Sequence, residues 1–458
     1  MRKFLCLIIF LVGLMLLAAP GSAQQASSLA SLASFTQEGH SFRDVRKCLD
    51  GDYRTYAPLL AGKTLEIDCG GLEMGYLQLR HYDRAVSYTV EVFDGASWHK
   101  LDEGGRFLSE GYELPEKTVR LRIHNTSRAR LFLTELGLYS AGTRPEDVQI
   151  WHEGGACDLM LISCHPDDEL LWFAGLLPTY AGERGLEVQT VTLVPSTPYR
   201  RLELLDALWH CGVTRYPSLL GFGDSVASTM NAQYRRWGRD SVERSIVGQL
   251  RRYRPRVVVT HDVHGEYGHA GHQVTADATI NAVDMAASSA KYPPSAKEYG
   301  TWQVQKLYVH LWKEQQVLMD WSVPLARFDG LTGMQVAMDA FRFHDSQIRR
   351  GWVMEEGGPC DSRLFGLYMS RVGPGTGKKD FMEHLGYPEP ESEDVELGEE
   401  ETMDDTDHAS YLVDDDADDE LQLLLTPTDL TAQHASAVPE KPVILQLTED
   451  EIDTLPDV

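Results

Sequence analysis

The stretch that decides the fold is CHPDDE at residues 164–169, which follows the apolar run LMLI (159–162) and precedes LLWFAG (170–175). A short apolar run that gives way to a proline and acidic residues indicates a buried strand turning into a helix. His165 then lies at the carboxyl end of that strand, where open α/β sheets bind their ligands. An imidazole beside two carboxylates at this edge points to a metal site.

The spacing within this motif separates its two aspartates. Residues three apart lie on one face of a helix, so His165 and Asp168 can grip one ion, whereas Asp167 points elsewhere and is free to act as a base. The alternative is an ordinary helix start, at which aspartate is a common cap and the histidine is incidental. A second motif has to decide between the two.

That second motif is HDVHGEYGHAGH at residues 261–272, directly after RVVVT (256–260). Valine-rich runs without alternation are typical of strands covered on both faces of a parallel sheet, so this loop should leave the same sheet edge as the first. His269 and His272 would share one face at the start of the following helix. The spacing alone leaves open whether they or the equally spaced His261 and His264 form the site.

Together the two elements resemble the PIG-L (LmbE-like) N-acetylglucosamine deacetylase family over residues 157–373. Residues 199–213 (YRRLELLDALWHCGV) are similar to the family's R-x-x-E helix, and FHDSQ (343–347) is similar to its H-x-S-Q segment. The sequence departs from the family in the second motif, where Ala270 and Gly271 replace a Pro-Asp pair.

The resemblance implies a catalytic Zn²⁺ held by His165, Asp168 and His272. Three protein ligands leave one position open, which is the pattern of catalytic zinc. Zinc lowers the pKa of a water in that position towards about 7, and Asp167 would take the proton as general base.

The same resemblance assigns roles to residues around the metal. His269 would stabilise the oxyanion and protonate the leaving amine, and Tyr267 would help to polarise the acetyl carbonyl. Arg200 would hold a sugar or phosphate oxygen, although Arg201 beside it is easily confused with it. The histidine and glutamine of the H-x-S-Q segment would either line the site or cap a helix.

Alternating apolar runs and helical stretches predict an α/β fold for residues 143–388. The expected strands are 159–162, 188–194, 257–260 and 305–311, and the expected helices are 170–184, 200–211, 240–252 and 274–287. This order is typical of a Rossmann-like, mainly parallel sheet that is covered on both sides. No G-x-G-x-x-G follows the first strand, so a dinucleotide is not expected.

Short runs with a period of two in residues 35–142 predict an antiparallel β-sandwich ahead of the α/β domain. It resembles a discoidin-like (galactose-binding-like) domain. Such a domain would either bind a glycan at loops or serve as an adaptor packed on the enzyme. The aromatic side chains that could stack on a sugar are Tyr53, Tyr56, His81, Tyr82 and Trp98.

The first 23 residues have the pattern of a secretory signal peptide. A basic start (MRK) precedes an apolar run at residues 4–19 and a small-residue site at 21–23. An uncleaved anchor is the alternative. No later stretch qualifies as a transmembrane span, so we expect a secreted or extracytoplasmic protein. We interpret residues 24–34 as a linker.

The net charge of −27 lies mostly in one segment. Residues 389–458 hold 24 acidic residues and one lysine, a net charge of −23 that leaves −4 for the rest of the chain. An acidic tail with few aromatic residues is expected to be disordered. A body without a basic stripe excludes nucleic acid as a partner.

Six cysteines follow the signal segment, too few for a disulfide scaffold. Cys48 and Cys69 would either form a disulfide with each other or remain two unpaired buried thiols. Cys164, beside His165, would be a small buried thiol rather than a ligand.

These features favour a zinc-dependent N-deacetylase, a carbon–nitrogen hydrolase that acts on linear amides. Its substrate would be an N-acetylated amino sugar or glycoconjugate of the N-acetylglucosamine type. Two alternatives are a carbohydrate-binding protein whose catalytic domain is silent and a zinc amidase for another N-acyl compound. The sequence does not decide among the acceptor glycans.

Overall fold

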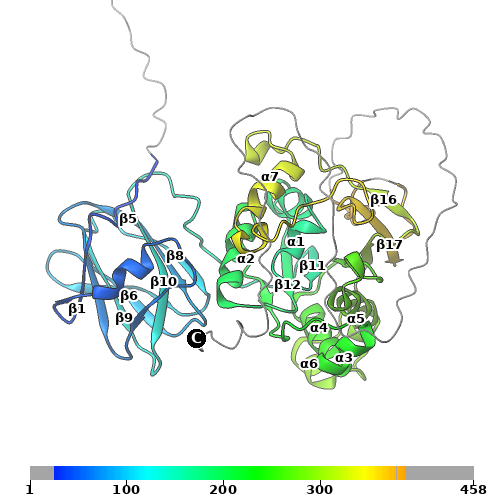
Figure 1. Ribbon diagram of the computed structural model, residues 1–458, viewed down its shortest axis with the longest axis horizontal. Coiled ribbons are helices and arrows are strands. Elements are labelled where there is room, and N and C mark those ends of the chain that lie inside the picture. Colours follow the sequence, from blue (N-terminus) through cyan, green and yellow to red (C-terminus); the bar gives the residue numbers. More distant parts are fainter. Residues whose placement is uncertain (1–24, 378, 388–458) are drawn as a thin grey trace, which may run out of the picture. The chain divides into compact units, whose positions relative to one another are not determined.

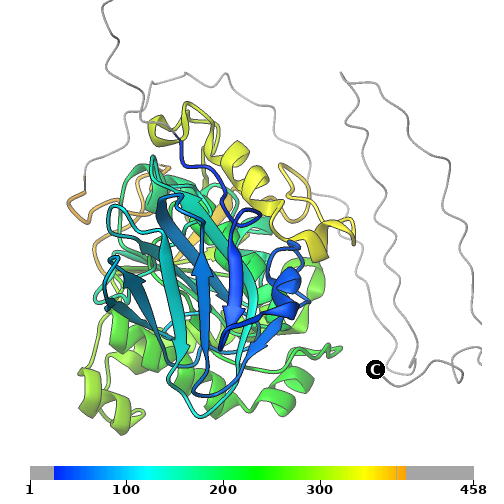
Figure 2. The same cartoon turned by 90° about the vertical axis from the view of Figure 1, so that its left-hand side faces the viewer.

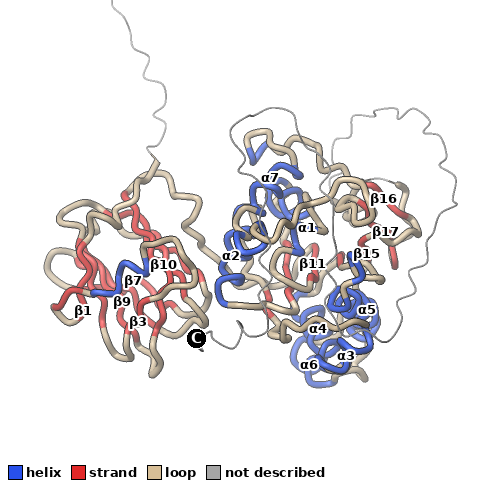
Figure 3. The backbone as a smooth tube through the Cα atoms, in the orientation of Figure 1, coloured by secondary structure: helices blue, strands red, loops and turns tan. Residues whose placement is uncertain are grey.

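A computed structural model describes residues 25–377 and 379–387. The expected signal segment and the acidic tail lie outside these residues. The described chain has a strand-rich N-terminal β region (β1 to β10) and an α/β region (β11 to β17); Figure 3 shows strands in red in both and most of the helices, in blue, in the α/β region. None of the helices within the described residues has the length and apolar character to cross a membrane.

Two antiparallel sheets form the N-terminal β region, and their strands are seen face-on in Figure 2. In spatial order, the first contains β2 (His40–Ser41), β1 (Ser34–Gln37), β4 (Thr64–Asp68), β9 (Arg120–Asn125), β6 (Tyr88–Phe93) and β7 (Trp98–Gly104). The second contains β3 (Ala57–Leu59), β10 (Leu131–Ser140), β5 (Met74–His81) and β8 (Ser109–Glu113). A short 3-10 helix, η1 (Arg43–Cys48), joins β2 to β3.

Alternation along these strands builds one shared core. Leu65 and Ile67 of β4 and Leu77 and Leu79 of β5 are all fully buried in the same apolar cluster, although they come from different sheets. In β4, β6 and β9 every second residue is buried, because side chains alternate across a strand. The period-two runs in the sequence therefore correspond to real strands.

Residues 25–33 differ from the expected linker. Gln25 forms an isolated β-bridge, a single backbone pairing, with Thr143, and Ser28 forms another with Tyr139 near the end of β10. Leu29 is buried in the core of the β region. The start of the described chain is thus packed onto the β region because an apolar side chain and backbone hydrogen bonds hold it there.

The α/β region contains one sheet of seven strands (Figure 1). Its order is β13 (Ser218–Leu219), β12 (Val188–Thr192), β11 (Leu159–Ser163), β14 (Val257–Thr260), β15 (Lys306–His310), β17 (Leu364–Ser370) and β16 (Gln316–Leu318). The first five strands are parallel. β17 pairs antiparallel with β15, and β16 pairs antiparallel with β17; the sequence predicted neither of these two strands.

Helices cover both faces of this sheet. Leu159 and Leu161 pack in one cluster with α1 (Asp168–Leu171), α2 (Pro198–His210) and α7 (Gly333–Phe341). Met160 and Ile162 pack in the other with α4 (Arg239–Tyr253) and α5 (Ala270–Ala286). The remaining helical elements are η2 (Pro178–Glu183), α3 (Met230–Trp237), η3 (Glu266–Gly268), α6 (Pro293–Tyr299), η4 (Ala326–Phe328) and α8 (Asp345–Ile348).

One predicted helix, 170–184, is wrong as a continuous element. The chain instead forms the single turn α1 and, after a break, the π-helix η2. Ala174 at the break has φ = 36°, outside the helical range, and a Cβ on Gly175 would lie 2.8 Å from the Trp321 ring. Pro178 then removes a backbone donor, so the helix cannot run through.

All six cysteines from Cys48 onward are free and buried. The bridge considered between Cys48 and Cys69 is therefore absent, and the alternative of two buried thiols is the one found. The Cys48 thiol donates to the carbonyl of Leu133 at 3.3 Å.

Candidate active site

Two neighbouring parallel strands bring the candidate residues together. β11 pairs with β14 in register from Leu159 opposite Val257 to Ile162 opposite Thr260. The segments that leave their carboxyl ends are residues 164–169 and 261–272. Because parallel strands end at the same edge, residues a hundred positions apart in sequence meet there.

Three side chains converge as a candidate metal centre. His272 Nε2 lies 3.3 Å from His165 Nδ1 and 3.4 Å from Asp168 Oδ1, and His165 Nδ1 lies 3.2 Å from Asp168 Oδ2. A tetrahedral zinc with ligands at about 2.0–2.1 Å separates its ligand atoms by about 3.4 Å. The three groups therefore fit a zinc ion in both chemistry and spacing.

Asp168 is held for this role by its own loop. Its Oδ2 accepts the backbone N–H of His165 at 2.6 Å, and its Oδ1 accepts the indole N–H of Trp172 at 2.9 Å. Burial opposes ionisation, but His272 and His165 hold the pKa of Asp168 well below its usual range. The carboxylate is thus charged and oriented.

Glu266 lies behind the histidines and is completely buried. Its Oε2 accepts from Nδ1 of His272 at 2.7 Å and from Nδ1 of His261 at 2.8 Å, and its Oε1 accepts from Nδ1 of His310 at 2.7 Å. These bonds place hydrogen on Nδ1 of His272 and leave Nε2 free to face the metal position. A carboxylate in this place is a standard means of orienting a histidine ligand.

Asp167 does not belong to the candidate ligand group, which contains its neighbours His165 and Asp168. It is buried and lies 3.2 Å from the Arg200 guanidinium, which also donates to the carbonyl of Pro166. Burial and the neighbouring Asp168 raise the pKa of Asp167 to about 8, while Arg200 opposes the rise. Its backbone has φ = 118° and ψ = −32°, a conformation that L residues rarely adopt.

His269 and Tyr267 lie on the open side of the centre. The centroid of the His269 ring lies 5.0 Å from that of His165 and 5.6 Å from that of Tyr267, and Tyr267 is 43% exposed. Trp352, which the sequence did not single out, packs 5.2 Å from Tyr267. Burial, with His272 and His165, lowers the pKa of His269 to about 3, so this ring is neutral before substrate binds.

The structure separates the pairs that spacing left open. His261 is completely buried, and its Nε2 accepts the N–H of Cys164 at 3.0 Å, whereas His264 is exposed. Arg201 donates to the carbonyls of Asp83 and Ser196 and not to the candidate centre. The geometry therefore brings together His269, His272 and Arg200.

Cys164 is buried, as expected, but it lies closer to the centre than expected. Its Sγ is 3.6 Å from His165 Nε2, and it belongs with the three expected ligands to one group that could hold a metal. A Cβ on Gly271 would lie 3.0 Å from this sulfur. The glycine that replaces the family's aspartate thus permits this close packing.

Sequence reasoning missed four buried polar residues near the centre: Glu169, Glu203, Glu266 and His310. Three of them lie within motifs already quoted, at positions to which no role was given. His310 ends a parallel strand at the same sheet edge, which was the signal available for it.

Comparison with known proteins identifies the family of the α/β region. The family described as PIG-L: GlcNAc-PI de-N-acetylase matches residues 160–283. A 1D-myo-inositol 2-acetamido-2-deoxy-α-D-glucopyranoside deacetylase of Mycobacterium leprae (strain Br4923) is 33% identical over 226 residues, which are 43% of this chain and 67% of that protein. The chain belongs to the PIG-L family.

Other PIG-L relatives match over a shorter part. A deacetylase of the same description from Rhodococcus jostii (strain RHA1) is 35% identical over 179 residues, 33% of this chain and 60% of its own length. The chain spans 57–60% of the length of this protein and of two Frankia relatives. The solved N,N'-diacetylchitobiose deacetylase from Pyrococcus horikoshii is 18% identical with a TM-score of 0.33, covering 42% of this chain and 71% of that one.

Proposed function

We propose that the protein is a zinc-dependent hydrolase that removes the N-acetyl group from an N-acetylglucosamine-type amino sugar or glycoconjugate. The observation that carries this proposal is the convergence of His165, Asp168 and His272: the two histidine nitrogens lie 3.3 Å apart, and each lies 3.2–3.4 Å from a different carboxylate oxygen of Asp168, with Asp167 beside them. The named PIG-L relatives are deacetylases of acetamido sugars, which supports the same substrate class.

Zinc bound by the three residues would polarise the acetyl carbonyl and acidify a water molecule. Asp167 acts as the general base that takes a proton from the attacking water, because burial and the neighbouring Asp168 raise its pKa and so make the ionised carboxylate a stronger proton acceptor. Arg200 fixes the Asp167 carboxylate through the 3.2 Å contact and can hold a substrate oxygen with its remaining donors.

His269 and Tyr267 act on the open side, where the substrate must enter. The proton that Asp167 takes from the water ends on the leaving amine, and His269 delivers it through Nδ1, which has no partner among the described residues. The Tyr267 hydroxyl donates to the developing oxyanion. Trp352, packed on Tyr267, offers an apolar surface to the sugar ring.

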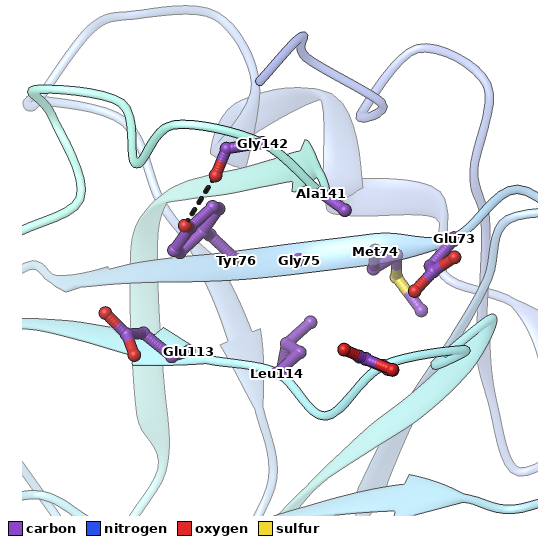
Figure 4. Close-up of a pocket in the computed structure, with 9 residues that line it drawn as sticks. Glu73, Met74, Gly75, Tyr76, Glu113, Leu114, Ala141 and Gly142 are labelled. Carbon is purple, nitrogen blue, oxygen red and sulfur yellow. Dashed lines mark hydrogen bonds between the residues drawn. The ribbon is translucent and has the colours of Figure 1, made fainter. Parts of the chain in front are cut away.

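For the rest of the chain we propose a Rossmann-like catalytic domain preceded by a discoidin-like β-sandwich in an exported protein. A glycan at the β region could not use His81, which is buried, and the half-buried Tyr53 donates its hydroxyl to Asp206. Tyr56 and Tyr82, with ring centroids 4.5 Å apart, are therefore the better pair. A pocket of about 160 Å³ lies at the start of β5 and the ends of β8 and β10 (Figure 4). Its lining includes three glutamates, Glu73, Glu113 and Glu116.

The test is acetate release by the purified full-length protein from a panel of N-acetylglucosamine conjugates. We expect chelation to abolish release and zinc to restore it. Asp167→Asn should lower kcat by about 10²–10⁴-fold while zinc content stays at the wild-type value, because the base is lost and the ligands remain.

A matched pair of variants checks the ligand assignment. His272→Gln should lose zinc and activity, whereas His264→Gln, at the exposed histidine with the same spacing, should change neither. Zinc binding without acetate release from any sugar would contradict the proposed substrate class and favour an amidase for another N-acyl compound.

A further inference from the structure

Three buried residues of the quoted motifs, Glu169, Glu203 and His344, have no part in the chemistry proposed above, and neither has the half-buried Ser346. Glu169 ends the first motif, Glu203 lies in α2 one turn after Arg200, and the other two lie at the start of α8. Glu169 and His344 are almost completely buried. Burying ionisable side chains costs free energy unless they are paired, so their arrangement needs a cause.

The contacts of Glu169 lead directly to the backbone of Asp167. One carboxylate oxygen of Glu169, Oε2, accepts the Asp167 N–H at 2.8 Å. The other, Oε1, accepts from His344 Nε2 at 2.6 Å. Glu169 is therefore a link whose one end holds Asp167 and whose other end is fixed by His344.

Glu203 fixes the position of His344 in turn. Its Oε1 accepts the backbone N–H of Ser346 at 3.1 Å, and its Oε2 accepts the Ser346 hydroxyl at 2.6 Å. Both bonds anchor the first turn of α8 to α2. The same helix α2 also carries Arg200, which lies 3.2 Å from the Asp167 carboxylate.

The backbone of Asp167, around which these contacts lie, is strained. Asp167 has φ = 118°, and a non-glycine residue in such a conformation costs of order 1–3 kcal/mol and persists only where its surroundings enforce it. Arg200 holds the side chain and Glu169 holds the N–H, so both ends of the residue are determined.

We propose that Glu169 and His344 are positioning residues that keep Asp167 in its strained conformation, with Glu203 and Ser346 anchoring His344. This inference rests on the proposed function only in that Asp167 is taken as the base. His344 acts through Glu169 and donates one hydrogen bond; it does not exchange protons with substrate. Any side chain that donates from the place of Nε2 should therefore replace it.

This leads to a comparison of two variants at one position. His344→Gln carries an amide N–H that can reach Glu169, whereas His344→Leu carries no donor. We expect His344→Leu to lower kcat by about 10–100-fold with KM and zinc content near the wild-type values, because misplacing a catalytic group by about 1 Å costs this much. We expect His344→Gln to recover most of the loss.

His81→Leu is the matched control for removing a fully buried, carboxylate-paired histidine. His81 Nε2 lies 3.5 Å from Glu110 in the β region, and its loss should leave kcat unchanged. If His344→Leu does not fold, Glu169→Gln takes its place. The Asp167 N–H and His344 Nε2 face different carboxylate oxygens of Glu169, and the amide NH₂ of glutamine would replace one of these two acceptors. Equal losses in His344→Gln and His344→Leu would overturn the proposal, since they would show that the imidazole itself is needed.

A crystal structure of the His344→Leu or Glu169→Gln variant supplies a readout that does not depend on activity. We expect Asp167 to relax to negative φ in the variant, whereas an unchanged φ near 118° would overturn the proposal. An inactive wild-type protein would refute the proposed function alone, and the conformation of Asp167 in the variants would still decide whether the positioning contacts exist.

Discussion

Two buried carboxylates, Glu266 and Asp206, each collect several donors but do so with different partners. Glu266 accepts from the Nδ1 atoms of three histidines at the sheet edge. Asp206 in α2 accepts from Arg80 at 2.8 Å, from Gln149 at 2.5 Å and from the Tyr53 hydroxyl. Both carboxylates are satisfied, yet only the first lies at a candidate metal centre.

The difference lies in what the donors can do next. A histidine bound through Nδ1 still offers Nε2 to a metal, so the Glu266 cluster can perform chemistry. Arginine, glutamine and tyrosine have no comparable second role at neutral pH, so the Asp206 cluster can only hold the structure together. It joins α2 to Tyr53 and Arg80 of the β region, and α2 carries Arg200 and Glu203.

The largest effect on stability is expected from Asp206→Asn. Removing one partner of a buried ion pair leaves Arg80 buried and unpaired, which costs about 3–5 kcal/mol in the free energy of unfolding. Chemical denaturation of the full-length protein measures this loss. If the comparison holds, zinc affinity per folded molecule should not change.

Asp240→Asn is the control for this prediction. Asp240 pairs with Arg244 on the surface of α4, where both side chains are at least 60% exposed, so its loss should cost no more than about 0.5 kcal/mol. A stability loss at Asp206 as small as at Asp240 would show that the buried network does not hold the β region to α2.

A third buried carboxylate, Glu110, extends the comparison to the stability of the protein at low pH. Burial opposes its ionisation, but His81, Tyr88 and the Gly105 N–H lower the pKa of Glu110 to about 2. Its folded-state pKa is below its unfolded value, so its contribution is present above pH about 4.5 and is lost as pH falls towards 2. Between these pH values the free energy of unfolding should fall by about 3 kcal/mol less in Glu110→Gln than in the wild type.

The measurement is denaturation of wild type and variant at a series of pH values between 2 and 6. Because other carboxylates titrate in the same range, the difference between the two curves carries the result. Parallel curves would mean that Glu110 is not stabilised as a carboxylate in the folded protein.

Much of the fold could be predicted from the sequence, because its main signals are local. The valine-rich run at 257–260 became β14 with those bounds, and period-two runs became the strands of both N-terminal sheets. What could not be predicted depended on distant contacts. The break in helix 170–184 lies where Trp321 packs against Gly175, and β17 pairs with two strands, β15 and β16, that lie some fifty residues earlier in the chain.

The candidate site divides in the same way. His165, Asp168 and His272 could be named from motif spacing and resemblance, and the structure brings them together. The glutamates around them could not, because a carboxylate within a motif does not show which distant histidine it faces. Glu169 meets His344 across 175 positions, and Glu266 meets His310 across 44.

The smallest effect in free energy is expected from Glu266→Gln, and it tests the chemical side of the comparison. One amide oxygen cannot accept from three histidines, so His272 loses the bond that fixes its Nδ1–H and the orientation of Nε2. Loss of such a partner typically weakens metal affinity by about 10–100-fold, or about 1.4–2.7 kcal/mol. Competition with a chelator measures this affinity directly, and Asp206→Asn provides the reverse pattern of a destabilised fold with normal affinity. If Glu266→Gln instead lost stability at wild-type zinc affinity, the two carboxylates would have the same role, and the distinction drawn from their donors would fail.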